Sequence, residues 1–144
     1  MPVNPKTLLF ADDDVEDFEI FKEAFLQVAP DCAILHVLRC DEVVDAIKTI
    51  RPDLVFLDLK MPGGDGAGCL KALKQNNETA DIPIVIYSTS SYHMSVEDCY
   101  RLSASRYFVK PSSLVELNAG IKRIVELYKT GNLIRPEFNE FMIR

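Results

Sequence analysis

The chain has 144 residues, about the size of one average domain, and hydrophobic residues make up 48% of it, which is enough for a sizeable core. It carries 16 lysines and arginines against 22 aspartates and glutamates, so its net charge of −6 argues against nucleic acid or an anionic membrane surface as a partner. No stretch approaches the ~18 apolar residues of a transmembrane helix, and residues 1–6 lack the layout of a signal peptide, so we expect a cytoplasmic protein.

Five short runs of branched or aromatic apolar residues recur along the chain and predict β-strands. Their apolarity is nearly continuous, whereas a strand with one solvated face alternates between apolar and polar residues. This pattern is typical of a parallel sheet that is covered on both faces. The five runs are Thr7–Ala11, Ala33–Leu38, Leu54–Leu57, Ile84–Tyr87 and Tyr107–Val109.

Segments with helical periodicity separate these strands. In the first segment, Phe18, Phe21 and Phe25 recur at the spacing of one helix face. The fourth segment begins at a possible capping box, Ser95–Asp98, and the last helix follows a second such pattern, Ser113–Glu116. The predicted helices are Val15–Ala29, Asp41–Ile50, Gly68–Lys74, Val96–Leu102 and a last helix with apolar residues from Leu117 to Tyr128.

The alternation of strands and helices predicts an α/β fold, in which five βα units form a doubly wound, five-stranded parallel sheet. Right-handed crossovers would place helices on both faces and a ligand at the carboxyl ends of the strands. We expect one domain over residues 1–144, with a core of about residues 6–129 and a tail, residues 130–144, that packs back on it. The apolar residues of this tail include Phe138, Phe141, Met142 and Ile143.

Polar side chains follow four of the five predicted strands. Asp12 and Asp13 come after the first strand, Asp58 after the third, Ser88 after the fourth and Lys110 after the fifth. Because parallel strands all point the same way, these groups should converge on one edge of the sheet. This convergence is the strongest functional signal in the sequence.

The chemistry of this group favours a magnesium-dependent phosphoryl-transfer site. Asp12, Asp13 and Asp58 would repel one another and require a counter-charge, and oxygen ligands of this kind suit Mg²⁺. An aspartate can act as a nucleophile, while Lys110 and Ser88 could stabilise charge on phosphoryl oxygens. Any one of these aspartates could instead be a helix N-cap, so the interpretation depends on their joint occurrence.

Other polar residues are interpreted as structural. Asp14, Glu16, Asp17 and Glu19 fit a solvated first helical turn, where negative charge is favoured by the helix dipole. Two histidines, His36 in a strand and His93 in a loop, have no partner at the spacing of a metal site or a catalytic triad. We therefore expect neither group to belong to the site.

Four separated motifs carry a resemblance to a known family. They are LLFADDD, LVFLDLKMPGGDG, IPIVIYST and RYFVKP, and they occur in this order between about Lys6 and Lys129. On these motifs the chain resembles the receiver domains of two-component response regulators, the family of the chemotaxis protein CheY, whose fold is flavodoxin-like. Residues 75–81 and the tail are similar to the single-domain regulators associated with bacterial phytochromes.

The resemblance implies a phosphoacceptor and a metal site. Asp58 would accept the phosphoryl group. Asp13 would bind Mg²⁺ directly, Asp12 would bind it through water, and both Asp58 and the backbone carbonyl of Lys60 would be further ligands.

The resemblance also implies a route from this site to the protein surface. Ser88 would be the hydroxyl switch, Lys110 would pair with the phosphoryl group, and the Lys110–Pro111 peptide bond would be cis. Movement of Ser88 would open room for the ring of Tyr107, the aromatic switch, to turn inward. The surface that responds would include the fourth helix, the fifth strand and the fifth helix.

A stand-alone response regulator is the function that these observations favour. A histidine kinase or phosphotransfer protein would supply the phosphoryl group to Asp58, and an unknown downstream protein or a second copy of the chain would dock on the responsive surface. The domain would catalyse only its own phosphorylation and dephosphorylation, with Mg²⁺ as its cofactor.

Two alternatives use a similar sheet. A phosphotransferase or phosphatase of the haloacid-dehalogenase type would place its nucleophile after the first strand, in a DxD pattern that small residues follow. The sequence Asp12–Val15 lacks those small residues. A flavodoxin-like FMN-binding module would have a loop rich in serine, threonine and glycine there, where this chain has carboxylates that would repel phosphate.

Overall fold

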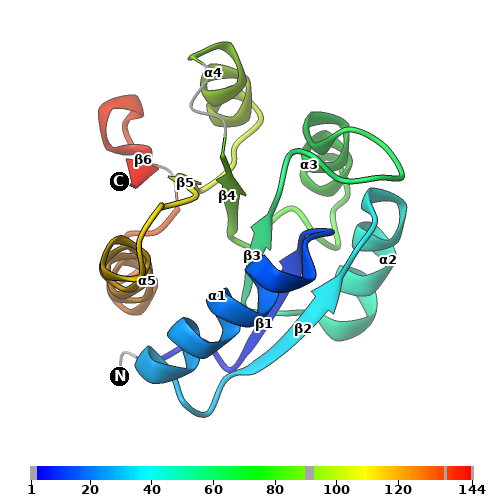
Figure 1. Cartoon of the computed structure of the whole chain (residues 1–144). Helices are drawn as coiled ribbons and strands as arrows, with labels where there is room; N and C mark the ends of the chain where they lie inside the picture. Colours follow the sequence, from blue (N-terminus) through cyan, green and yellow to red (C-terminus); the bar gives the residue numbers. More distant parts are fainter. Residues whose placement is uncertain (1–2, 90–92, 135, 144) are drawn as a thin grey trace.

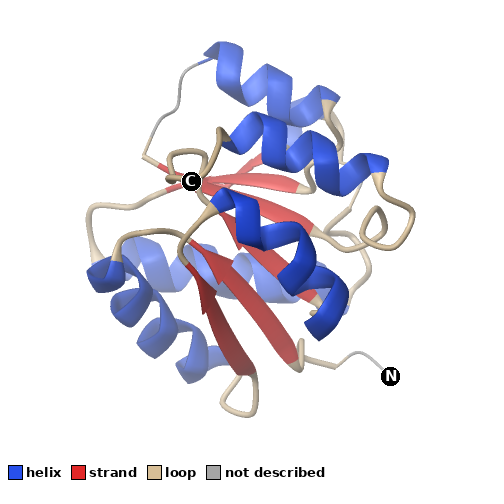
Figure 2. Cartoon of the chain, turned by 90° about the vertical axis from the view of Figure 1, so that its right-hand side faces the viewer, coloured by secondary structure: helices blue, strands red, loops and turns tan. Residues whose placement is uncertain are grey.

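The computed structural model describes residues 3–89, 93–134 and 136–143, with residues 93–95 described by their backbone alone. These residues form one sheet with helices on both faces (Figures 1 and 2). The elements in chain order are β1 Thr7–Ala11, α1 Val15–Val28, β2 Ala33–Val37, α2 Cys40–Ile50, β3 Leu54–Leu57, α3 Gly66–Gln75, β4 Ile84–Ser88, α4 His93–Arg101, β5 Arg106–Val109, α5 Leu114–Lys129, the 3-10 helix η1 Phe138–Glu140 and β6 Met142–Ile143.

The strand order is β2-β1-β3-β4-β5-β6, and every pair of neighbours is parallel. This arrangement confirms the doubly wound α/β fold and its five-stranded parallel core. A sixth strand, β6, extends the sheet beside β5, which the sequence did not predict. No helix among the described residues is long and apolar enough to cross a lipid bilayer.

Alternate residues along each strand face two different hydrophobic layers. In β1, Leu8 and Phe10 face the layer under α1 and α5, whereas Leu9 and Ala11 face the layer under α2, α3 and α4. Figure 1 shows α1 and α5 on one side of the sheet and α2 and α3 on the other. The near-continuous apolarity of the strands is therefore explained by burial on both faces.

The two layers differ in composition. The layer under α1 and α5, which we call the aromatic layer, is dominated by packed rings. The layer under α2, α3 and α4, which we call the aliphatic layer, consists mainly of leucine, isoleucine, valine and cysteine side chains, with Tyr107 and Phe141 as its aromatic members. The rings of the aromatic layer are Phe10, Phe18, Phe21, Phe25, Phe56, Tyr87 and Phe108.

Side-chain caps fix the starts of α1 and α5. The Asp14 carboxylate accepts a hydrogen bond from the Asp17 amide at the start of α1, and the Ser113 hydroxyl accepts one from the Glu116 amide at the start of α5. The expected cap at Ser95 is wrong, because α4 already begins at His93 and Ser95 lies inside it. A capping pattern marks a helix start only when the residues before it do not continue the helix.

The tail packs back on the sheet, as expected. Phe141 is fully buried and Ile143 is 6% exposed. In β6, Met142 pairs with Tyr107 and Ile143 pairs with Phe108. A strand of two residues is too short to show an alternating or continuous apolar pattern, so its pairing could not be read from the sequence.

Candidate functional site

Three carboxylates meet at the carboxyl edge of the sheet. Asp12 follows β1 and is 1% exposed, Asp58 follows β3 and is 6% exposed, and Asp13 lies at the surface. One ligand oxygen from each residue lies within 4.8 Å of the others. The structure therefore brings together the acidic group that the strand ends indicated.

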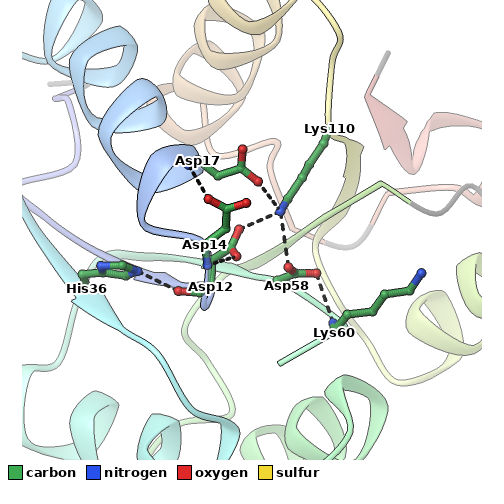
Figure 3. A network of polar contacts seen from close by, with 7 residues as sticks. All are labelled: Asp12, Asp14, Asp17, His36, Asp58, Lys60 and Lys110. Atoms are coloured by element: carbon green, nitrogen blue, oxygen red, sulfur yellow. Dashed lines mark hydrogen bonds and ion pairs between the residues drawn. The ribbon is translucent and has the colours of Figure 1, made fainter. Parts of the chain in front are cut away.

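Backbone amides hold the two buried carboxylates in place. Asp12 Oδ1 accepts a hydrogen bond from the Asp14 amide at 3.0 Å, and Asp58 Oδ1 accepts one from the Lys60 amide at 3.1 Å. The Asp58 amide in turn donates to the Ala11 carbonyl at 2.9 Å. Each carboxylate thus has one oxygen fixed by the chain and a second oxygen directed at a common cation (Figure 3).

That cation is the ammonium group of Lys110. Its Nζ lies 2.8 Å from Asp12 Oδ2, 2.8 Å from Asp17 Oδ2 and 3.3 Å from Asp58 Oδ2. It also lies 5.5 Å from the centroid of the Tyr87 ring, at the top of the aromatic layer. Burial alone would lower the pKa of Lys110, but the surrounding carboxylates raise it well above its usual range.

The site is short of positive charge. Burial raises the pKa of Asp12 from 3.8 to about 6 even though Lys110 opposes that shift, and the charge of Asp58 adds to it. Three carboxylates, those of Asp12, Asp17 and Asp58, contact the single ammonium group, and Asp13 lies beside two of them, so the negative charges outnumber the positive one. A divalent cation would supply the missing charge, and carboxylate oxygens are the hard ligands that Mg²⁺ prefers.

Glycines shape the loop that leads from Asp58 to α3. Gly63 and Gly64 have φ values of +89° and +137°, a backbone conformation that other residues rarely adopt. Gly66 begins α3 against the backbone of Leu59, where a Cβ atom would overlap. Because Gly66 has no side chain, the start of α3 can lie directly against the backbone of Leu59, the residue after Asp58.

Ser88 and Tyr107 lie inside the protein, next to this group of charges. Both residues are fully buried, and the Lys110 amide donates to the Ser88 carbonyl at 2.8 Å. Burial raises the pKa of the Tyr107 hydroxyl, and its hydrogen bond with the Ser88 side chain opposes that change. The Tyr107 ring is already buried in this structure, with its centroid 6.3 Å from that of the Phe141 ring of the tail, and its turning when Asp58 is phosphorylated stays a prediction.

Asp17 is a site residue that the sequence interpretation missed. We assigned it to a solvated helical turn, but its carboxylate pairs with Lys110. One feature of the sequence could have indicated this role: Asp17 lies in the first turn of α1, directly after the aspartates at the end of β1. A side chain there that faces the sheet can reach its carboxyl edge. Its partner became clear only once β1 and β5 were placed in the sheet.

His36 supports the site from the neighbouring strand without joining the acidic group. Its ring is stacked on Phe18 with centroids 4.0 Å apart, and its Nε2 donates to the Asp12 carbonyl at 2.7 Å. The structural interpretation of this histidine agrees with these contacts. His93, expected in a loop, instead begins α4.

Two further expectations concern the backbone near the site. Lys60 contributes its amide to Asp58, and its side chain points away from the carboxylates in Figure 3. The described residues contain no cis peptide bond, so the expected cis bond between Lys110 and Pro111 is wrong. The trans form is favoured by about 0.5–1 kcal/mol for such bonds unless the surroundings impose the cis form.

Comparison with known proteins decides the family. The family model of the response regulator receiver domain matches residues 8–122 of this chain. The chain belongs to this family. Receiver domains are signalling domains of two-component systems that interact with histidine kinases or phosphotransfer proteins and bind Mg²⁺ at an acidic pocket. The match confirms the resemblance inferred from the four motifs and gives no support to the haloacid-dehalogenase or flavodoxin alternatives.

Curated relatives of this receiver domain include regulators with longer chains. The phosphate regulon transcriptional regulatory protein PhoB of Pseudomonas aeruginosa is 29% identical over 131 residues, which are 91% of this chain and 56% of that protein. The two-component response regulator ARR15 of Arabidopsis thaliana is 31% identical over 63% of this chain and 42% of that protein. The chain thus spans about half the length of these relatives.

Solved structures with the same fold include two other response regulators. The phosphorylated cyanobacterial phytochrome response regulator RcpA is 25% identical, with a TM-score of 0.76 over 85% of this chain and 93% of that one. The Mn²⁺-bound response regulator Rcp1 is 23% identical, with a TM-score of 0.78 over 92% of this chain and 100% of that one. This likeness extends to nearly the whole length of both regulators.

Proposed function

We propose that this receiver domain accepts a phosphoryl group on Asp58 from a phosphohistidine of a histidine kinase or phosphotransfer protein. One observation carries the proposal: Asp58 is buried at a strand end, with Oδ1 held by the Lys60 amide and Oδ2 3.3 Å from the Lys110 ammonium. A nucleophilic carboxylate needs this combination of fixed orientation and adjacent positive charge.

The transfer forms a bond between an Asp58 carboxylate oxygen and phosphorus and breaks the bond between phosphorus and the donor's imidazole nitrogen. The imidazole leaves with the electron pair of that bond and takes up a proton. Lys110 neutralises negative charge on the phosphoryl oxygens, and the Lys60 amide keeps the carboxylate in position. The Ser88 hydroxyl would donate a hydrogen bond to a new phosphoryl oxygen on Asp58.

Asp12, Asp13 and Asp58 would hold Mg²⁺, together with the backbone carbonyl of Lys60. When bound, the ion would offset the charge of the carboxylates and of the incoming phosphoryl group. The three carboxylate oxygens within 4.8 Å and the raised pKa of Asp12 support this assignment. In this proposal Asp13, which is exposed at the rim, would bind the ion directly, and the more buried Asp12 would bind it through water.

The signal leaves the site through Ser88 and Tyr107. Their hydrogen bond links the sheet edge to β5, so the face formed by α4, β5 and α5 is the surface we propose for a downstream protein or for a second copy of the chain. In this account the protein works in the cytoplasm, catalyses only reactions of its own phosphoryl group, and forms one unit with a core of about residues 6–129.

Intact-mass analysis after incubation with acetyl phosphate and Mg²⁺ tests the proposal. We expect the protein to gain one phosphoryl group, which mild base then removes as it would from an acyl phosphate. Asp58→Asn should gain none, and protein treated with a chelator should gain little. Equal phosphorylation of Asp58→Asn would overturn the assignment.

A further inference from the structure

Within the described part of the chain, the Lys110 ammonium has one carboxylate partner outside the group that would hold Mg²⁺. Its Nζ lies 2.8 Å from Asp12, 2.8 Å from Asp17 and 3.3 Å from Asp58. Asp12 and Asp58 belong with Asp13 to the group of converging carboxylates, and Asp58 would also carry the phosphoryl group. In the proposed reaction these two contacts would change, whereas Asp17 is needed neither as a metal ligand nor as the nucleophile.

The first turn of α1 fixes the backbone of Asp17. Its amide donates a hydrogen bond to the Asp14 carboxylate at 3.0 Å, which caps the helix. The next residue, Phe18, is 8% exposed, and its ring centroid lies 5.6 Å from that of Phe10 and 4.0 Å from that of His36. The Asp17 carboxylate therefore projects from an anchored turn toward the carboxyl edge of the sheet, as Figure 3 shows.

Lys110 depends on partners at its tip because its side chain is long. The backbone is fixed, since the Lys110 amide donates to the Ser88 carbonyl at 2.8 Å, but a flexible stem of four carbon atoms separates it from the ammonium group. The Tyr87 ring, with its centroid 5.5 Å from Nζ, limits the ammonium on the side of the aromatic layer. Asp17 and Asp58 contact the ammonium from α1 and from the end of β3 (Figure 3).

We propose that Asp17 is a positioning residue that keeps the Lys110 ammonium beside Asp58 during phosphoryl transfer, an inference that rests on the proposed function. The Asp58 oxygen that bonds to phosphorus loses its charge and becomes a weak partner for the lysine. Asp17 keeps its charge throughout, so it holds one of the three N–H donors of the ammonium while another turns to a phosphoryl oxygen. Its charge also offsets the repulsion between the ammonium and a Mg²⁺ ion on Asp12 and Asp58.

Phosphorylation rates with acetyl phosphate and Mg²⁺ give the first test. We expect Asp17→Asn to slow the gain of the phosphoryl group about tenfold, because a misplaced charge stabilises the transition state less well. Glu16→Gln removes the same charge from an exposed side chain in the same turn of α1 and should react at the wild-type rate. Asp17→Asn combined with Lys110→Ala should react no more slowly than Lys110→Ala alone, because Asp17 acts through the lysine.

The NMR signal of the Lys110 ammonium gives a second test, in protein without metal. The lysine side chain is only 11% exposed and its ammonium is paired with carboxylates, so we expect a slowly exchanging signal, which its loss in Lys110→Ala assigns. Asp17→Asn should make exchange of these protons with water about tenfold faster. Glu16→Gln should leave the signal as in the wild type.

Three results would overturn the positioning role and leave the phosphoacceptor proposal intact. They are a wild-type rate in folded Asp17→Asn, a further loss of rate when Asp17→Asn is added to Lys110→Ala, and an unchanged ammonium signal in Asp17→Asn. Thermal melting shows whether each variant is folded. A wild type that gains no phosphoryl group on Asp58 would instead contradict the proposed function, and the role of Asp17 in the transfer would fail with it.

Discussion

The two hydrophobic layers of the sheet support the site in different ways. In the aromatic layer, Phe21 lies 4.5 Å from Phe10 and 4.6 Å from Phe56 between ring centroids, and Tyr87 extends the cluster to the Lys110 ammonium. In the aliphatic layer, Tyr107 connects the site to Phe141 in the tail. Rings have few rotamers and large contact areas, so the first layer holds the charges in place, while the second layer contains Tyr107 and the α4 side of the signalling face.

Removing the central ring of the aromatic layer should give the largest loss of stability. We expect Phe21→Ala to lower the free energy of unfolding by about 4 kcal/mol, because it deletes a fully buried ring between four others. Leu70→Ala, an equally buried change in the aliphatic layer, should cost about 3 kcal/mol. Urea unfolding measures both, and a larger loss for Leu70→Ala would contradict this view of the layers.

Removing the cation above the aromatic layer should affect chemistry. Lys110→Ala is expected to slow phosphorylation by acetyl phosphate about 100-fold, because no fixed positive charge would then face Asp58 Oδ2. Lys71→Ala, on the exposed surface of α3, is the matched control and should react at the wild-type rate. Thermal melting of both variants separates loss of chemistry from loss of fold, and wild-type rates in folded Lys110→Ala would remove this lysine from the site.

The smallest expected effect concerns the metal. Mg²⁺ should stabilise the wild type by about 1–2 kcal/mol at concentrations above its dissociation constant, because it binds only the folded protein. Asp13→Ala should be more stable than the wild type without metal, since one repelling carboxylate is gone, and should lose most of the stabilisation by Mg²⁺. Melting temperatures with and without Mg²⁺ give this comparison, and equal stabilisation of both proteins would place the ion elsewhere.

Regular local patterns in the sequence predicted most of the fold. The bounds of β1 and β3 agree with the prediction to the residue, because their apolar runs end abruptly at Asp12 and at Asp58. The start of α4 was placed three residues late, and β6 was missed, because neither depends on a local pattern. Strand β6 forms by pairing with the edge strand β5, a contact between segments that are distant in sequence.

The candidate site was predictable to the extent that it depends on strand ends. Parallel topology alone places Asp12, Asp58 and Lys110 together, whatever the details of packing. Asp17 and the buried position of Tyr107 could not be predicted in the same way. Asp17 depends on the direction in which a helical side chain points, and Tyr107 depends on a tail contact that is distant in sequence.

Localising the phosphoryl group tests the central claim most directly. After phosphorylation by acetyl phosphate, borohydride reduces an aspartyl phosphate to homoserine, and tandem mass spectrometry of peptides then identifies the modified position. We predict homoserine at position 58 alone, in a yield that falls when Mg²⁺ is removed. Homoserine at position 12 or 13, or no homoserine in protein that has gained a phosphoryl group, would contradict the account.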